Sequence, residues 1–206
     1  MKFYMTPGSC STGIHILLEE LELPFAAYIL NLPAGDHRKP DYLALNPKAT
    51  IPTLVLDDDT AITEFAAIAY WLARKYPKAR FLPDNLNDEA RVIEVLTYVT
   101  GTVHGQAYTR IFTTDSYSSN PDDHAAIQAK GKEMVAHCFE ILDAQLAGRE
   151  YVVSHFTIAD AALFYVEFWA EKIGLTLPAN LKAHYERMLQ RPVVRRVLAE
   201  EGYRLG

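Results

Sequence analysis

The chain has 206 residues, of which 50% are hydrophobic and 22% charged, enough for one large or two small compact domains. The net charge is −6 with no run of Lys and Arg, which argues against a nucleic-acid-binding surface. No apolar run approaches the roughly 20 residues of a membrane helix, and two distant cysteines do not make a disulfide framework. We therefore expect a soluble cytoplasmic protein.

The first part of the chain alternates short strands and helices. Ile14, Leu17, Leu18 and Leu21 recur at helical spacing, which predicts a helix that stops before Pro24. We expect strands over residues 2–5, 25–30, 53–56 and 61–62, and helices over residues 14–23, 41–45 and 64–75. Residues 1–78 are therefore predicted to form a small α/β domain.

Residues 76–88 contain two prolines and two asparagines and interrupt this pattern, and within them we predict a linker over residues 79–88. The rest of the chain has helical periodicity, with helices expected over residues 89–112, 120–146, 157–169, 181–190 and 193–200. Asn120 is followed by proline and two acids, and Thr157 forms a capping-box variant with Asp160. Residues 89–206 are therefore predicted to be an all-helical domain.

Several familiar motifs are incomplete. Gly8 and Gly13 have the spacing of a phosphate loop, but Ile14 and His15 follow instead of lysine and a hydroxyl residue. The histidines form no HExxH pattern and no Cys/His cluster with zinc spacing, so no metal is expected. His15 is expected to be structural. Surface positions are expected for His37, His124, His155 and His184.

Cys10 follows a strand and a Pro-Gly turn and precedes a helix. Backbone N–H groups at a helix start stabilise an anion, so a thiol there is expected to have a lowered pKa. Ser9 and Ser11 flank it and can donate hydrogen bonds. The alternative is that Cys10 is a small buried hydrophobic residue. Cys138, in the middle of an expected helix, is interpreted as core.

Two further elements suggest a binding site for a peptide-like ligand. Pro47 and Pro52 bracket a turn before a strand, and a cis bond at Pro52 would leave the N–H and C=O groups of Ile51 free to pair with such a ligand. Glu64 opens a helix, where its carboxylate could hold a ligand ammonium group. The alternative for the segment around Pro52 is an ordinary Pro-rich turn. The alternative for Glu64 is an acid in the first turn that complements the helix dipole.

Taken in order, these segments resemble glutathione transferases. The resemblance rests on Thr-Pro-Gly-Ser-Cys-Ser, Asn-Pro-Lys-x-x-Ile-Pro-Thr-Leu, Glu-x-x-Ala-Ile-x-x-Trp-Leu-Ala-x-Lys-Tyr-Pro and the later Phe-Thr-Ile-Ala-Asp, and covers nearly the whole chain. The Pro-Gly-x-Cys-Ser start is similar to the bacterial beta class, in which cysteine replaces the usual tyrosine or serine. The resemblance implies a thioredoxin-like first domain, an all-helical second domain and a homodimer.

The resemblance also implies roles for individual residues. Cys10 would be catalytic, glutathione would be a co-substrate, and no cofactor is expected. Phe65 replaces the family's serine, whose hydroxyl binds the γ-glutamyl carboxylate; losing such a hydrogen bond costs roughly 1.5–3 kcal/mol. In the beta class, a histidine and a lysine on the long helix of the second domain border the glutathione site. Here His104 matches the histidine, whereas Gly105 stands in place of the lysine. The glutathione-binding residues implied are Ser9, Ser11, Lys39, Thr50, Ile51, Pro52, Glu64, Phe65 and His104.

Two functional hypotheses follow. The first is conjugation of reduced glutathione to small hydrophobic electrophiles, with the thiolate stabilised by Cys10 or by a nearby serine hydroxyl, and with thiol–disulfide exchange at Cys10 as a variant. The electrophile pocket is expected between the domains, lined by Tyr108, Phe112 and Phe164. The alternative for these aromatic residues is helix-packing core, which is the favoured interpretation for Phe164. The second is a binding or interaction module that keeps the fold without turnover, motivated by Phe65 and Gly105.

Overall fold

The computed structural model describes residues 1–204 and divides the chain into two compact units. One unit comprises residues 1–83 together with the chain from Met188 onward, and the other comprises residues 84–187. The predicted boundaries instead gave the whole C-terminal segment to the helical domain. No helix within residues 1–204 has the length and apolar character needed to cross a membrane.

A four-stranded mixed sheet organises the first unit. Its strands are β1 (Lys2–Met5), β2 (Ala26–Ile29), β3 (Thr53–Val55) and β4 (Ala61–Thr63), in the order β2-β1-β3-β4. β1 pairs parallel with β2 and antiparallel with β3, and β3 pairs antiparallel with β4. The four predicted strands are confirmed, with end shifts of a residue or two.

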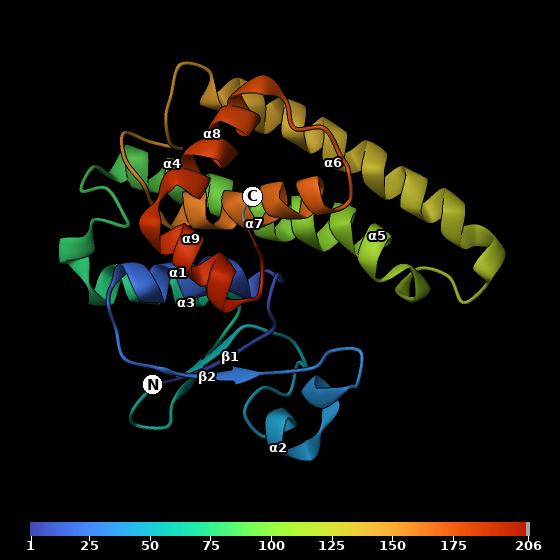
Figure 1. Ribbon diagram of the computed structural model, residues 1–206, viewed down its shortest axis with the longest axis horizontal. Coiled ribbons are helices and arrows are strands. Elements are labelled where there is room, and N and C mark those ends of the chain that lie inside the picture. Colours follow the sequence, from blue (N-terminus) through green and yellow to red (C-terminus); the bar gives the residue numbers. More distant parts are fainter. Residues whose placement is uncertain (205–206) are drawn as a thin grey trace. The chain divides into compact units, whose positions relative to one another are not determined.

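Helices cover both sides of this sheet. α1 (Ser11–Glu20) and α3 (Phe65–Lys75) lie side by side on one side, and α2 (Pro40–Leu43) lies on the other (Figure 1). Two 3-10 turns, η1 (Asp36–Arg38) and η2 (Pro77–Ala79), lie in the connections. The apolar stripe predicted for the first helix is buried, because Ile14, Leu17 and Leu18 have no exposed surface.

α9 (Pro192–Glu200) explains why the end of the chain belongs to the first unit. It packs against α1, where Arg191 pairs with Glu20 at 2.6 Å and Arg196 pairs with Glu19 at 2.7 Å. Residue spacing along α9 predicts a helix but not which neighbour it meets, because contacts over more than 170 residues leave no local pattern.

The second unit is entirely helical. Its helices are α4 (Leu86–Thr97), η3 (Tyr98–Tyr108), α5 (Thr109–Phe112), α6 (His124–Leu146), α7 (Ile158–Lys172) and the start of α8 (Ala179–Gln190), with short turns η4 (Thr114–Ser116) and η5 (Pro121–Asp123). α7 is buried on all sides over residues 158–170, as its apolar sequence predicts. Thr157 and Asp160 form the predicted capping box, and Cys138 is buried as expected.

Two expectations for the helical unit are corrected. The helix predicted over residues 89–112 is interrupted by η3, whose turns are π-helical and wider than α-helical ones. His184 is not a surface group: it is 1% exposed and pairs with Glu167 and Asp160. A histidine on a polar-looking helix can be buried when carboxylates from other segments satisfy both ring nitrogens.

Candidate active site

Cys10 occupies the N-cap position of α1 and is 7% exposed. Its Sγ atom donates a hydrogen bond to the carbonyl oxygen of Ile51 at 3.6 Å. The thiol therefore joins two segments that the sequence separates by about 40 residues. This contact brings together the first two elements that the sequence singled out.

The protonation state of Cys10 differs from the expectation. Burial raises the pKa of its thiol to about 12, outweighing the backbone N–H groups of Cys10 and Ser11, which lower it; the charge of Glu64 adds to the increase. The N–H groups at the helix start do lower the pKa of Cys10, as predicted, but desolvation of the thiolate raises this pKa by more. Cys10 is therefore a neutral thiol, and a hydrogen-bond donor, at neutral pH.

The two serines beside Cys10 hold the turn in place. Ser11 is fully buried; its backbone N–H donates to Ser9 Oγ at 3.1 Å and its own Oγ donates to the carbonyl oxygen of Thr6 at 3.0 Å. Ser9 Oγ and Ser11 Oγ lie 2.6 Å apart. These bonds occupy Ser11 within the turn, whereas Ser9 is only partly buried.

The turn before β3 has the geometry that its prolines predict. The peptide bond between Ile51 and Pro52 is cis. The carbonyl oxygen of Thr50 accepts hydrogen bonds from the Tyr42 hydroxyl and from Asn46 Nδ2, so it faces inward. Within the described residues, the N–H group of Ile51 donates to no backbone carbonyl. That donor is left for an extended ligand.

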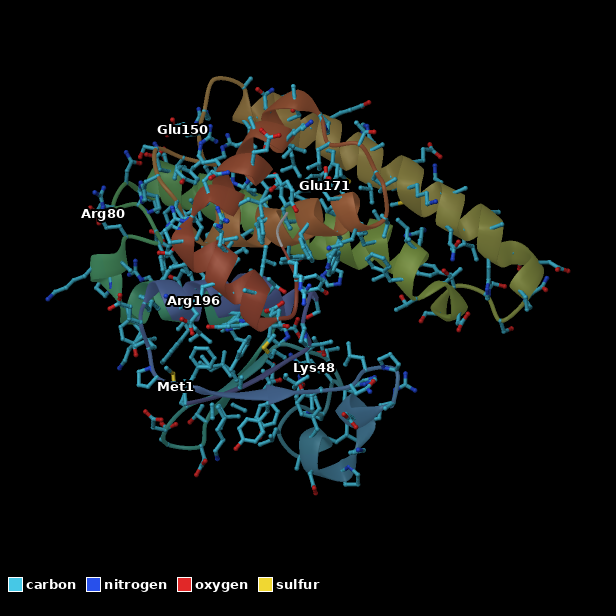
Figure 2. The ribbon with its side chains drawn as sticks, in the orientation of Figure 1. Met1, Lys48, Arg80, Glu150, Glu171 and Arg196 are labelled. Atoms are coloured by element: carbon cyan, nitrogen blue, oxygen red, sulfur yellow. The ribbon has the colours of Figure 1, made fainter. Side chains whose placement is uncertain are left out.

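Glu64 lies at the N-cap of α3 with φ 74°, a left-handed conformation unusual for a residue with a side chain. Its Oε1 atom is 2.6 Å from Lys48 Nζ, and both side chains are accessible to solvent (Figure 2 labels Lys48). The sequence analysis did not single out Lys48, although it stands in the Asn-Pro-Lys turn. Lys39 pairs instead with Asp36, at 2.6 Å.

Phe65 turns its ring into the core and is 6% exposed. The serine hydroxyl expected by resemblance is therefore replaced by a buried ring, and the donors that α3 can offer to an anionic ligand are the backbone N–H groups of its first turn. Replacing Phe65 with serine would leave a cavity as well as adding a hydroxyl.

The loop before Cys10 is fastened by the end of the chain. Glu201 Oε2 accepts hydrogen bonds from the Gly8 N–H group and from Thr12 Oγ1, both at 2.7 Å. Gly8 has φ 72°, and a Cβ atom there would lie 1.9 Å from the Tyr203 hydroxyl. Sequence reasoning missed this anchor because Glu201 is 193 residues from Gly8 in the chain.

In the helical unit, His104 lies on η3 between aromatic rings. Its ring centroid is 4.8 Å from that of Trp169, and its Nδ1 atom is 3.3 Å from the Tyr165 hydroxyl. Burial lowers the pKa of His104 to about 4, so the ring is neutral at pH 7. The sequence analysis did not predict that Tyr165 and Trp169 contact His104.

The three aromatic residues expected to line an electrophile pocket differ in exposure. Phe164 has no exposed surface and stacks between Phe168 and Tyr185, which makes it core. Tyr108 is also fully buried, and its hydroxyl donates to the carbonyl oxygen of Val166 at 2.8 Å. The expectation that their surfaces line a pocket is therefore corrected. Phe112 is 48% exposed and stacks on Tyr108.

A four-stranded mixed sheet, a cysteine at the start of α1 and a cis-proline before β3 define a thioredoxin-like unit, here followed by an all-helical one. Residues 8–75 match the N-terminal domain of glutathione S-transferases, and residues 122–187 match the C-terminal domain. The chain is 33% identical to glutathione S-transferase GstA of Escherichia coli O157:H7, across 98% of this chain and 99% of that protein. The chain belongs to the glutathione S-transferase family.

Solved structures give the same result. A glutathione transferase homologue from Sulfitobacter, with bound glutathione, has a TM-score of 0.90 and 28% identity, covering 97% of each chain. The bacterial beta class glutathione S-transferase of Sphingomonas chungbukensis has a TM-score of 0.84 and 30% identity, covering 98% of this chain and 99% of that one. The resemblance to this class in the sequence is thereby confirmed.

Proposed function

We propose that this protein is a glutathione transferase that joins reduced glutathione to small hydrophobic electrophiles, with Cys10 as the residue facing the glutathione sulfur. The observation that supports this most directly is the contact of Cys10 Sγ with the Ile51 carbonyl oxygen beside the cis bond to Pro52. A ligand that pairs with the Ile51 backbone brings its own side chain close to Cys10.

The first unit offers partners for the cysteinyl and γ-glutamyl parts of glutathione. The N–H and C=O groups of Ile51 can pair with the cysteinyl backbone in strand fashion. The Glu64 carboxylate can hold the γ-glutamyl ammonium group, and the N–H groups at the start of α3 can hold its carboxylate. Lys48, which pairs with Glu64 at 2.6 Å, lies at this same end of the site and can add a positive charge for the γ-glutamyl carboxylate.

Conjugation needs the glutathione sulfur as a thiolate, and Cys10 can stabilise that anion by donating its S–H bond. The raised pKa suits this role, because a thiol near pKa 12 keeps its proton at neutral pH. The same property disfavours thiol–disulfide exchange as the main activity, since exchange requires an attacking thiolate on the protein.

The second substrate is proposed to meet apolar surface on the helical unit. Phe112 offers an exposed ring there, supported from beneath by Tyr108 and edge-on by Trp169. An aromatic surface of this kind suits small hydrophobic molecules. A homodimer and a cytoplasmic location remain predictions from the sequence.

Titration with reduced glutathione in a calorimeter at neutral pH, followed by a rate measurement with chlorodinitrobenzene, tests the proposal. We expect saturable binding in the micromolar to low-millimolar range together with turnover. Binding without turnover would favour the interaction module instead. Absence of both would mean that Phe65 has disabled the glutathione site.

Glu64→Gln is expected to weaken glutathione binding about 10- to 100-fold, because a hydrogen bond to a charged group contributes roughly 1.5–3 kcal/mol. Calorimetry measures the change directly. Asp41→Asn, a loss of one exposed acid in the same unit, is the matched control and should leave the affinity unchanged. Equal affinities for the Glu64→Gln and wild-type proteins would refute the assigned role.

Cys10→Ala is expected to raise the pKa of bound glutathione by about one to two units, since it removes a donor to the thiolate. The pH profile of kcat/KM should shift upward accordingly, whereas Cys10→Ser, which keeps an O–H donor, should shift less. An unchanged profile in Cys10→Ala would show that another group stabilises the thiolate.

A further inference from the structure

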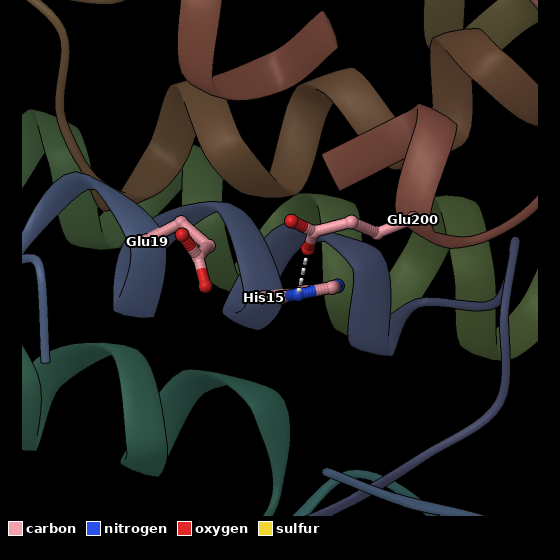
Figure 3. A group of neighbouring side chains, drawn as sticks. All are labelled: His15, Glu19 and Glu200. Atoms are coloured by element: carbon pink, nitrogen blue, oxygen red, sulfur yellow. Dashed lines mark ion pairs between the residues drawn. The ribbon is translucent and has the colours of Figure 1, made fainter. Parts of the chain in front are cut away.

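Three potential metal ligands converge on the first unit, away from Cys10's own contacts. His15 and Glu19 are four residues apart on α1, and Glu200 is the last residue of α9 (Figure 3). One ligand atom from each of the three side chains lies within 4.8 Å of the other two. His15 Nε2 is 3.4 Å from Glu200 Oε2.

His15 is held in a specific orientation. Its ring is 5% exposed, and Nδ1 lies 2.9 Å from Oε1 of Glu201. The other oxygen of Glu201 accepts two hydrogen bonds, from Gly8 N–H and Thr12 Oγ1. We assign Nδ1 as the donor to Glu201, which is the arrangement in which a carboxylate orients a metal-binding histidine.

This orientation directs Nε2 of His15 toward Glu200. The Glu200 carboxylate is the side-chain group that the structure places nearest to Nε2 within the cluster, at 3.4 Å. A cation between the two would be held by the ring nitrogen and a carboxylate oxygen together.

The three side chains border a cavity of about 280 Å³. Its remaining walls are mostly apolar and come from β1, β2 and the adjoining loops: Met5, Pro7, Phe25, Ala27 and Ile29. An apolar wall strengthens the attraction between a cation and the carboxylates by reducing solvent screening. The volume leaves room for water molecules to complete the coordination.

We propose that His15, Glu19 and Glu200 bind a divalent first-row transition-metal ion, with Zn²⁺ as the best match. One imidazole nitrogen and two carboxylate oxygens suit this class better than Mg²⁺ or Ca²⁺, which prefer oxygen alone. Bonds of about 2.0–2.2 Å place neighbouring ligand atoms roughly 3–3.5 Å apart. Glu200, half exposed at the end of α9, can rotate to close the present spacing.

Arg196 competes with the metal for Glu19. Its Nη2 atom lies 2.7 Å from Glu19 Oε2, and this pair occupies one of the two carboxylate oxygens. The guanidinium also places a positive charge beside the proposed cation. Removing Arg196 should therefore strengthen metal binding, a result that a purely structural cluster would not produce.

The test is a calorimetric titration of the chelator-treated, glutathione-free full-length protein with Zn²⁺ at pH 7. We expect one Zn²⁺ per chain and a higher Tm with Zn²⁺ present. The Cys10→Ser protein should bind equally well, which excludes the thiol as a ligand. The absence of Zn²⁺ binding would overturn the proposal.

Substitutions identify which residues bind the metal. Mutating a residue that only hydrogen-bonds to a metal ligand typically lowers metal affinity 10- to 100-fold, so Glu200→Gln, which changes a ligand itself, should weaken Zn²⁺ binding at least about tenfold. Arg196→Gln should tighten it. The matched control is Glu140→Gln, which disrupts a surface His137–Glu140 pair on α6 and should change nothing. Weakening by Glu140→Gln but not by Glu200→Gln would place the metal elsewhere and refute the site.

Discussion

His184→Gln is expected to lower the free energy of unfolding by about 3–5 kcal/mol, because it leaves two buried carboxylates without their cation. His184 Nδ1 lies 2.9 Å from Glu167 Oε2, and Nε2 lies 3.3 Å from Asp160 Oδ1. All three side chains are almost completely buried within the helical unit. Asp160 also accepts hydrogen bonds from the N–H groups of Val152 and Thr157, so the loss reaches the start of α7.

The same cluster sets a pH dependence. Burial lowers the pKa of His184, but the carboxylates of Glu167 and Asp160 outweigh it and raise the pKa to about 10. Burial raises the pKa of Glu167 to about 7, against the opposing effect of His184. Both folded-state values lie above the unfolded ones, so the folded state binds more protons. The His184 contribution is therefore complete below about pH 6.5 and is lost as the pH rises through about 10.

Urea unfolding at pH 6.5, 8 and 10 measures both effects. The wild-type protein should lose stability as the pH rises, and the His184→Gln protein should lack the part of this decline that His184 causes. His137→Gln, at an exposed position of α6, is the matched control and should have little effect. A loss below about 1 kcal/mol for His184→Gln would show that the cluster is not an ion pair in the folded protein.

Cys10 should show no thiolate between pH 6 and 9, although an ordinary cysteine is largely ionised at the upper end of this range. With a pKa of about 12, only about one thiol in 10⁵ is ionised at pH 7 and one in 10³ at pH 9. The physical reason is that desolvation of the buried sulfur outweighs the N–H groups at the start of α1.

Thiolate absorbance near 240 nm, recorded against pH, tests this directly. The difference between the wild-type and Cys10→Ser proteins isolates Cys10 from Cys138 and the tyrosines. We expect a flat difference up to pH 9. A step centred below about pH 8 would show that Cys10 is an activated nucleophile, and disulfide exchange would then become the favoured activity.

Local sequence determined the elements of this protein with few errors. The apolar stripe of α1 and the nearly continuous apolar body of α7 are short-range patterns, and each predicts its element from neighbouring residues alone. The capping box at Thr157 and the cis bond before Pro52 depend on residues within a few positions of each other. The motifs that carry the family resemblance are local for the same reason.

Properties that depend on surroundings were decided by the tertiary structure. The pKa of Cys10 and the burial of His184 differ from the expectations, because each depends on which distant segments cover the side chain. Lys48 meets Glu64, and Glu201 meets the loop before Cys10, only once the chain has folded. Desolvation and charge interactions act through space over a few ångströms. The sequence by itself therefore determined where the thiol lies along the chain, and the packing around it decided that it keeps its proton.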